Sequence, residues 1–203
     1  MKPTIYTLII LLILSCKVQN QKFVTTKNNV SPIESKIIID FLTAELEKDR
    51  YKYERNYRLV IIEEALKKQK SISTYEFNYK YKDSWGKFIN EWILDSLQVK
   101  KIKEELENEE VYHWKESNFT NLKVSILRRE ELREIINKGK PLQNNLIIYL
   151  SRPLIINKKN AFISFDIGNG DFGYGAITHF TVLMRKANDK WVESAHYYDG
   201  VFD

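Results

Sequence analysis

A chain of 203 residues with 43% hydrophobic residues suits one domain, or one domain with a small helical extension, and can build a real core. The net charge of +5 arises from 32 basic against 27 acidic residues without a dense Lys/Arg block, which argues against specific nucleic-acid binding. The single cysteine, Cys16, excludes an intrachain disulfide and a cysteine metal cluster.

The first residues have the features of a signal peptide. A positive charge at Lys2 precedes the apolar run Ile5–Leu14, whose length of about ten residues is too short for a spanning helix. The sequence Ile13-Leu14-Ser15-Cys16 then resembles a bacterial lipobox. That resemblance implies cleavage after residue 15 and lipidation of the Cys16 thiol, with acyl chains as the membrane anchor. The alternative is an uncleaved anchor with an incidental cysteine.

A polar tether over residues 16–30 is expected to follow the signal peptide of residues 1–15. Lys17 stands directly after Cys16, where the inner-membrane retention signal of some lipoproteins has Asp. This resemblance favours the outer membrane. No acidic cluster follows Cys16, which favours the periplasmic face of that membrane.

The remaining residues, 31–203, are expected to form a single domain that begins with a helix. Ser31 can cap the helix, Pro32 suits its first position and Glu34 completes a capping box, so the sequence predicts a helix from Pro32 to about Asp49. The run Val60-Ile61-Ile62 predicts a strand within residues 58–65.

An alternation of aromatic and polar residues follows. Tyr75, Phe77, Tyr79 and Tyr81 recur at every second position, which predicts a strand with one aromatic face. Together with Trp85 this face is a candidate platform on which a glycan could stack. The alternative is that the aromatic residues form the core face of a strand that the first helix covers.

Further helices and short strands are predicted before the C-terminal third. Residues 85–94 have helical spacing, and Asp95 with Gln98 predicts the capped start of a helix that reaches about Glu109, with Leu97, Ile102 and Leu106 facing inward. A strand is expected over residues 122–126 and a helix over residues 130–138, with Leu132, Ile135 and Ile136 facing inward and Gly139 at its end.

The last third, Leu146–Tyr198, consists of apolar and β-branched runs separated by turn residues. This pattern is typical of an antiparallel meander, with a hairpin tip at Asn188-Asp189. The predicted fold class is therefore α+β, with several helices packed on a mainly antiparallel sheet that ends in a C-terminal β-meander.

The glycine-rich segment Gly168–Gly173 matches the pattern G-x-G-x-x-G, but a strand rather than a helix is expected after it. We therefore interpret these glycines as hairpin or bulge residues rather than as a dinucleotide site. Asp166, Asn169 and Asp171 could offer oxygens to Ca²⁺, although the loop lacks the EF-hand order, and a plain turn is the alternative. Neither a metal nor a cofactor is predicted.

Two histidines lie near these carboxylates. Pairing across the hairpin tip is expected to bring His196 within a residue or two of His179, and a shared face would let the two bind metal or share a proton. The nearby carboxylates that could complete a hydrolytic site are Asp166, Asp171, Glu193 and Asp199. The alternative is two solvated histidines on a sheet.

The chain resembles a group of Gram-negative bacterial lipoproteins without an assigned activity. The residues that carry this resemblance are the lipobox, LIIYLSRPLII, FDIGNGDFGYG and the final NDKWVESAHYYDG. It implies a helical N-terminal half before a small antiparallel sheet that a Lys-Trp strand closes, and it transfers no functional residue beyond Cys16.

These observations predict a lipid-anchored envelope protein, most simply a non-enzymatic binding or structural module whose partner is a glycan or an envelope protein. One alternative is an immunity or inhibitor lipoprotein that blocks a periplasmic toxin or hydrolase with the loop Gly168–Gly175. The other is an envelope hydrolase that uses the Asp/His cluster.

Overall fold

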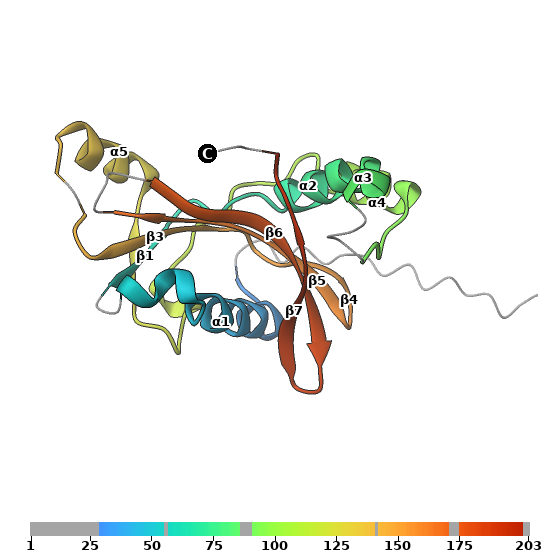
Figure 1. The fold of residues 1–203 in the computed structure, drawn as a ribbon, viewed down its shortest axis with the longest axis horizontal. Coiled ribbons are helices and arrows are strands. Elements are labelled where there is room, and N and C mark those ends of the chain that lie inside the picture. The colour runs from blue at the N-terminus through green and yellow to red at the C-terminus, as the bar shows by residue number, and fades with distance from the viewer. Residues whose placement is uncertain (1–28, 55–56, 86–90, 141, 171–174, 201–203) are drawn as a thin grey trace, which may run out of the picture.

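The computed structural model describes residues 29–54, 57–85, 91–140, 142–170 and 175–200. They form a mixed seven-stranded sheet with helices on both of its faces (Figure 1). The elements in chain order are α1 (Pro32–Leu46), η2 (Asp49–Glu54), β1 (Arg58–Ile62), α2 (Lys68–Lys80), α3 (Lys82–Trp85), α4 (Ser96–Glu105), η3 (Glu116–Asn118), β2 (Val124–Leu127), α5 (Arg129–Asn137), β3 (Asn145–Leu150), β4 (Leu154–Asn157), β5 (Asn160–Asn169), β6 (Gly175–Ala187) and β7 (Lys190–Tyr197). The predicted α+β class is confirmed.

The sheet has the order β2-β1-β3-β5-β6-β7, and β4 pairs with β5 beside β3. The strands from β3 onward pair antiparallel, which confirms the C-terminal meander. The two N-terminal strands differ, because β1 pairs in parallel with both β2 and β3. The helical segments between β1 and β2 and between β2 and β3 supply the long crossovers that parallel pairing needs.

Helix α1 covers one face of the sheet and begins as predicted. The Ser31 hydroxyl accepts a hydrogen bond from the Glu34 backbone N–H, and the Glu34 carboxylate accepts one from the Ser31 backbone N–H at 2.9 Å. The apolar stripe of α1 is fully buried against the sheet, and its members are Ile37, Ile38, Phe41 and Leu42. The cluster that these residues form with the sheet is the largest of the described apolar clusters.

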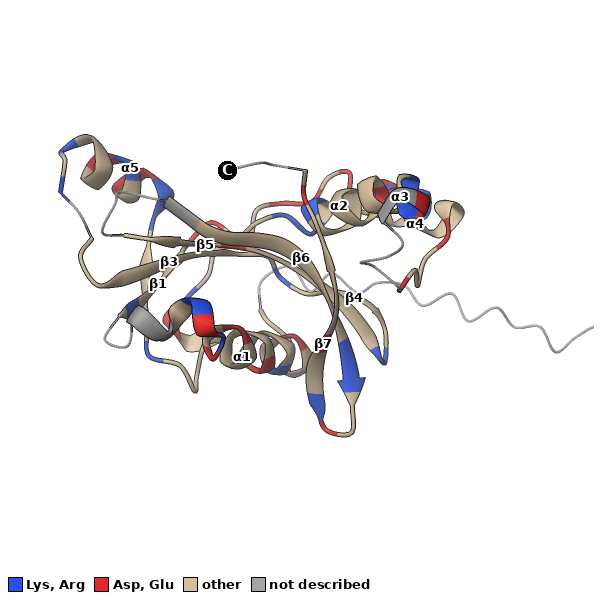
Figure 2. Ribbon diagram, in the orientation of Figure 1, with Lys and Arg blue, Asp and Glu red and all other residues tan. Residues whose placement is uncertain are grey.

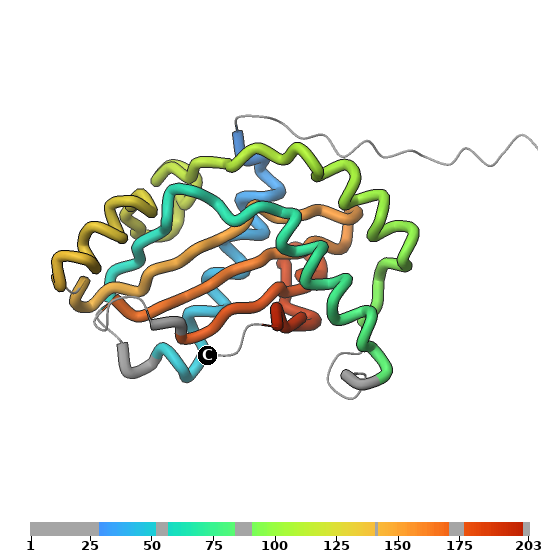
Figure 3. Tube along the Cα trace, turned by 90° about the horizontal axis from the view of Figure 1, so that it is seen from above, coloured from blue at the N-terminus to red at the C-terminus, as the bar shows by residue number. Residues whose placement is uncertain are grey.

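Two smaller apolar clusters lie on the opposite face. One packs α2 and α4 against the β5–β7 end of the sheet, and the other packs α5 against β1 and β3. Seen from above, α5 and α2 flank the strands while α1 crosses beneath them (Figure 3). Polar side chains of the central strands therefore lie between two apolar regions.

The strand predicted over the alternating aromatic residues is wrong, because Tyr75, Phe77 and Tyr79 lie in helix α2 and Tyr81 directly follows it. In a helix, residues four apart share a face whereas residues two apart point in nearly opposite directions. Tyr75 and Tyr79 therefore point into the core, while Phe77 and Tyr81 point outward. The single aromatic face of the sequence prediction becomes two separate pairs.

The later helices are largely as predicted. Asp95 and Gln98 cap α4 reciprocally, at 2.8 and 2.9 Å. The expected inward position of Leu97 is wrong, since this side chain is 79% exposed and Val99 is buried instead. Of the helix expected over residues 85–94, residues 86–90 lie outside the described part of the chain and residues 91–94 have no regular secondary structure.

Helix α5 confirms the expected short helix, and Gly139 follows it with a φ of 62°. Leu132 is buried as expected, whereas Ile136 is 40% exposed and so does not face inward. The hairpin tip at Asn188-Asp189 is confirmed, because β6 ends at Ala187 and β7 begins at Lys190.

The glycine-rich segment connects two strands. β5 ends at Asn169 and β6 begins at Gly175, with a bulge between Ile167 and Gly168. Residues 171–174 lie outside the described part of the chain. The helix that a dinucleotide site needs is replaced by strand β6, which agrees with the interpretation of the glycines as hairpin residues.

The signal peptide, Cys16 and nearly all of the tether fall on residues 1–28, outside the described part of the chain. Among the described helices, none combines the length and the apolar character that crossing a membrane requires.

Candidate functional site

A strip of polar side chains crosses the α2 side of the sheet between the apolar clusters under α5 and α2. Tyr149 of β3 lies opposite Asp166 of β5, and Asp166 lies opposite His179 of β6. Asp166 is two residues beyond Ser164, whose hydroxyl contacts that of Ser71 on α2 at 2.7 Å, so alternation places Asp166 on the α2 side. Burial raises the pKa of the Tyr149 hydroxyl, which therefore remains a neutral donor.

The last described residues complete this strip. Asp199 lies 2.9 Å from Nδ1 of His179 through Oδ1, and its Oδ2 lies 3.4 Å from Nζ of Lys70 on α2. The His179 and Asp199 side chains are each only 7% exposed. The contact ties the C-terminal end of the described chain to both the sheet and α2.

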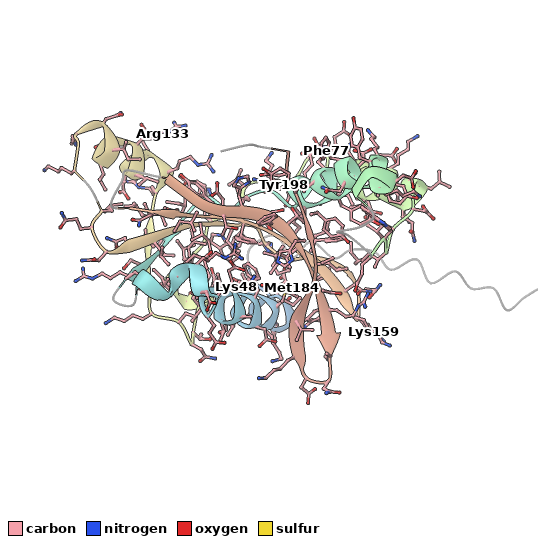
Figure 4. All side chains as sticks on the ribbon, viewed as in Figure 1. Lys48, Phe77, Arg133, Lys159, Met184 and Tyr198 are labelled. Carbon is pink, nitrogen blue, oxygen red and sulfur yellow. The ribbon has the colours of Figure 1, made fainter. Side chains whose placement is uncertain are left out.

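An exposed aromatic pair adjoins the polar strip on the outer side of α2. Phe77 and Tyr81 are 39% and 50% exposed, and their ring centroids lie 5.2 Å apart. A Cβ built on Gly200 would lie 3.6 Å from the Phe77 ring, so the segment that carries Asp199 passes beside this pair. Figure 4 labels Phe77 and Tyr198 on the same side of the sheet. We call Phe77 and Tyr81 the aromatic pair.

The other residues of the predicted platform do not join the aromatic pair. Tyr75 is fully buried, and its hydroxyl donates to the Leu94 carbonyl at 2.8 Å and accepts from the Leu94 N–H at 2.9 Å. Its ring lies within 6.0 Å of four other aromatic rings, those of Tyr79, Trp92, Phe162 and Tyr197. Tyr75 and Tyr79 are therefore core residues. Trp85 ends α3, and its side chain lies outside what the structure describes.

The two histidines of the sequence prediction lie on opposite faces of the sheet. His196 is opposite Val182, which is buried in the cluster beneath α1. His196 Nε2 lies 3.3 Å from Oε2 of Glu193, whereas His179 lies on the α2 side with Asp199. The expected proximity of His179 and His196 is therefore wrong, and the two do not form a shared site.

A second polar network connects β7 to the end of α1. Glu45 is fully buried and accepts a hydrogen bond from the Tyr51 hydroxyl at 2.9 Å, while Lys48 bridges Glu45 and Glu193, the latter at 2.8 Å. Burial acts to raise the pKa of Glu193, but hydrogen bonds from His196 and Lys48 outweigh it and lower that pKa below its ordinary value. This network fixes the end of α1 on β7 and has a structural role.

The residues proposed for Ca²⁺ cannot be assembled into a site. Asp171 lies outside the described part of the chain, and so does half of the predicted inhibitory loop Gly168–Gly175, since residues 171–174 are not described. Within the described ranges no group of three or more His, Cys, Asp or Glu side chains is placed to hold a metal ion.

The candidate site therefore combines Asp166, His179 and Asp199 with Lys70 and the aromatic pair. The sequence indicated the carboxylates and His179 through their closeness along the chain. Nothing local to Lys70 indicated its contact with Asp199, because α2 and the C-terminal end are distant in the sequence. Chemically, the arrangement offers polar groups that can exchange hydrogen bonds beside rings that can stack on an apolar surface.

Comparison of the chain with protein-family models, with curated proteins and with solved structures gives no match.

Proposed function

We propose that this protein is a non-enzymatic binding module, anchored in the outer membrane by lipid on Cys16, that holds a glycan against the aromatic pair. The observation that carries the proposal is the exposure of the Phe77 and Tyr81 rings beside the polar strip. Neighbouring exposed rings leave apolar surface in water, and such surface is typical of an interaction site.

A glycan suits this surface because a sugar ring has C–H groups on its faces and hydroxyls around its edge. The C–H groups can lie on the electron-rich faces of Phe77 and Tyr81. The neighbouring Lys70 is 34% exposed in its side chain and can donate to a sugar hydroxyl without leaving Asp199. The side chains of His179 and Asp199 are each only 7% exposed, and this burial supports a positioning role rather than proton transfer to a substrate.

The binding test uses isothermal titration of the full-length protein with oligosaccharides released from peptidoglycan and from outer-membrane glycolipid. We expect Phe77→Ala or Tyr81→Ala to weaken binding about tenfold, the equivalent of roughly 1.4 kcal/mol. Leu97→Ala is the matched control, because Leu97 is exposed on α4. The proposal would be contradicted if Phe77→Ala and Tyr81→Ala bound as tightly as the wild type, or if Leu97→Ala lost as much affinity as they do.

The anchor is tested separately by metabolic labelling with an alkyne analogue of palmitate, followed by membrane fractionation. We expect the protein to be labelled and to sediment with the outer membrane, and Cys16→Ser to abolish the label. A Cys16→Ser protein that still carries the label would show that the lipid is not on this thiol.

The His179–Asp199 contact favours a second candidate, an envelope hydrolase. A carboxylate on Nδ1 orients an imidazole so that its other nitrogen can act as a base. This candidate requires the same oligosaccharides to be cleaved by the wild type and left intact by His179→Ala. Binding without cleavage would exclude it.

A further inference from the structure

Two neighbouring hairpin tips at one end of the sheet carry a concentration of lysines. Lys158 and Lys159 occupy the turn between β4 and β5, and Lys186 and Lys190 flank the tip between β6 and β7. All four side chains are exposed. Figure 2 shows the basic colour at the ends of both hairpins. We call these four residues the lysine tips.

The two tips are held together rigidly. The backbone N–H of Lys186 donates to the carbonyl of Lys159 at 2.8 Å, which joins one hairpin to the other. The Asn157 side chain accepts hydrogen bonds from the backbone N–H groups of Lys159 and Asn160, at 2.9 and 3.0 Å, and so fixes the β4–β5 turn. The lysines are therefore presented by a pre-organised backbone.

The lysine tips have no ion-pair partner among the described residues. In the described ranges no carboxylate lies within ion-pairing distance of any of the four lysines, although the exposed Asp189 stands between Lys186 and Lys190. Several basic residues at the helices are paired, for example Lys103 with Glu76 at 2.6 Å and the cap residue Arg128 with Glu131 at 2.6 Å. The positive charge of the tips is thus not neutralised by ion pairs, unlike that of Lys103 and Arg128.

Strand β4 connects the start of the described chain to these tips. The carbonyl of Asn29 accepts a hydrogen bond from Nη2 of Arg152 at 3.4 Å, and strand β4 leads from Arg152 toward Lys158. Six residues of extended chain span about 20 Å. The segment between Cys16 and Asn29 can span at most about 45 Å. A bilayer that holds acyl chains on Cys16 is therefore within reach of the tips.

We infer that the lysine tips dock on the anionic phospholipid headgroups of the membrane to which the chain is tethered. This inference rests on the proposed anchor for the nearness of the bilayer and on charge complementarity for the contact. Each lysine near an anionic surface strengthens binding about fivefold, and the attraction decays within about 8 Å at physiological salt. The contact would orient the domain rather than replace the lipid anchor.

The test uses full-length Cys16→Ser protein, so that the result does not depend on acylation. Its partition is measured on vesicles of phosphatidylcholine alone and of phosphatidylcholine with phosphatidylglycerol. We expect tighter binding to the anionic vesicles, and Lys158→Gln with Lys159→Gln to reduce that binding at least tenfold. The paired change Lys100→Gln with Lys101→Gln, which removes the same charge from exposed positions on α4, is the matched control.

Lysine acetylation read by mass spectrometry supplies the second measurement. We expect the lysine tips to be protected on anionic vesicles and to regain reactivity at high salt, while Lys100 and Lys101 react equally on both vesicle types. Equal reactivity of the tips on both vesicles, or an equal loss of binding in the α4 control, would overturn the inference. If only the palmitate labelling failed, the lipid anchor would be refuted, and binding of the lysine tips to anionic headgroups would still be supported.

Discussion

Glu34 is the residue whose removal tests the energetics of this fold most directly. It is 4% exposed, and its carboxylate accepts hydrogen bonds from Arg152 at 3.1 Å through Oε1 and 2.9 Å through Oε2. It also accepts the N–H and the hydroxyl of Ser31, each at 2.9 Å. The ion pair between Glu34 and Arg152 thus joins the start of α1 to the β3–β4 connection, beside the beginning of the described chain. Glu34→Gln keeps the size of the side chain and removes its charge.

The expected loss is about 3–5 kcal/mol of unfolding free energy, because the buried Arg152 guanidinium keeps its charge without a carboxylate to balance it. For a domain with a total stability of roughly 5–15 kcal/mol this is a large fraction. With a urea dependence of about 2 kcal/mol per molar, the midpoint of unfolding should fall by about 2 M. Glu104→Gln is the control, since that carboxylate is 65% exposed and only 3.9 Å from Lys100.

The pH dependence gives a second observable for the same residue. Burial acts to raise the pKa of Glu34, but hydrogen bonds from Arg152 and Ser31 outweigh it and hold that pKa below its ordinary value. A carboxyl group whose pKa is lowered by folding stabilises the protein above its unfolded pKa, and this contribution is lost as the pH falls through the folded pKa.

Urea unfolding followed by tryptophan fluorescence between pH 3 and pH 7 measures both effects. We expect Glu34→Gln to be less stable than the wild type at pH 7 and to show a flatter acid limb. A loss below about 1 kcal/mol at pH 7, or an acid limb as steep as that of the wild type, would refute the view that the Glu34–Arg152 pair stabilises the fold.

Two further substitutions test packing at other positions. Tyr75→Phe removes the hydroxyl that forms hydrogen bonds with both backbone groups of Leu94, and we expect it to lower the free energy of unfolding by about 1–3 kcal/mol in thermal unfolding. Tyr81→Phe, on the exposed side of α2, is the control and should have no measurable effect. Equal effects of the two substitutions would contradict this role of Tyr75. Gly170→Ala would place a Cβ 2.5 Å from the carbonyl oxygen of Leu142, so we expect about 1–3 kcal/mol of destabilisation in urea unfolding, and an unchanged midpoint would mean that the backbone relaxes.

The helix starts show which elements the sequence could predict. For α1 and α4 the capping partners lie three residues apart, so the local sequence is sufficient. The start of α2 is different, because the N–H groups of Lys68 and Gln69 donate to the Glu109 carboxylate at 3.0 and 3.1 Å. That cap is about forty residues away in the sequence, and the local alternation of aromatic residues favoured a strand instead.

The candidate site was only partly predictable for a similar reason. A regular continuation of the hairpin from the Ala187–Lys190 pair would have placed His196 opposite Thr181, on the same face as His179. A bulge after Leu183 shifts the register by one residue, so His196 lies opposite Val182. A shift of one residue turns a side chain to the other face of the sheet. The composition of the hairpin does not reveal the bulge, and so the paired histidines were expected and not found.

The positions of the two proposed surfaces make them compatible in one molecule. Figure 4 labels Phe77 on the α2 side in the upper part of the view and Lys159 in the lower part, below the sheet. A domain that rests its lysine tips on headgroups would therefore hold the aromatic pair away from the bilayer, where a glycan could reach it. The Glu34–Arg152 pair fixes the first described residues next to β4, so under these proposals the tether and the lysine tips would approach the membrane from one part of the fold. Loosening that pair should then disturb the orientation of the domain on a vesicle before it disturbs the aromatic pair, because α2 belongs to a separate apolar cluster.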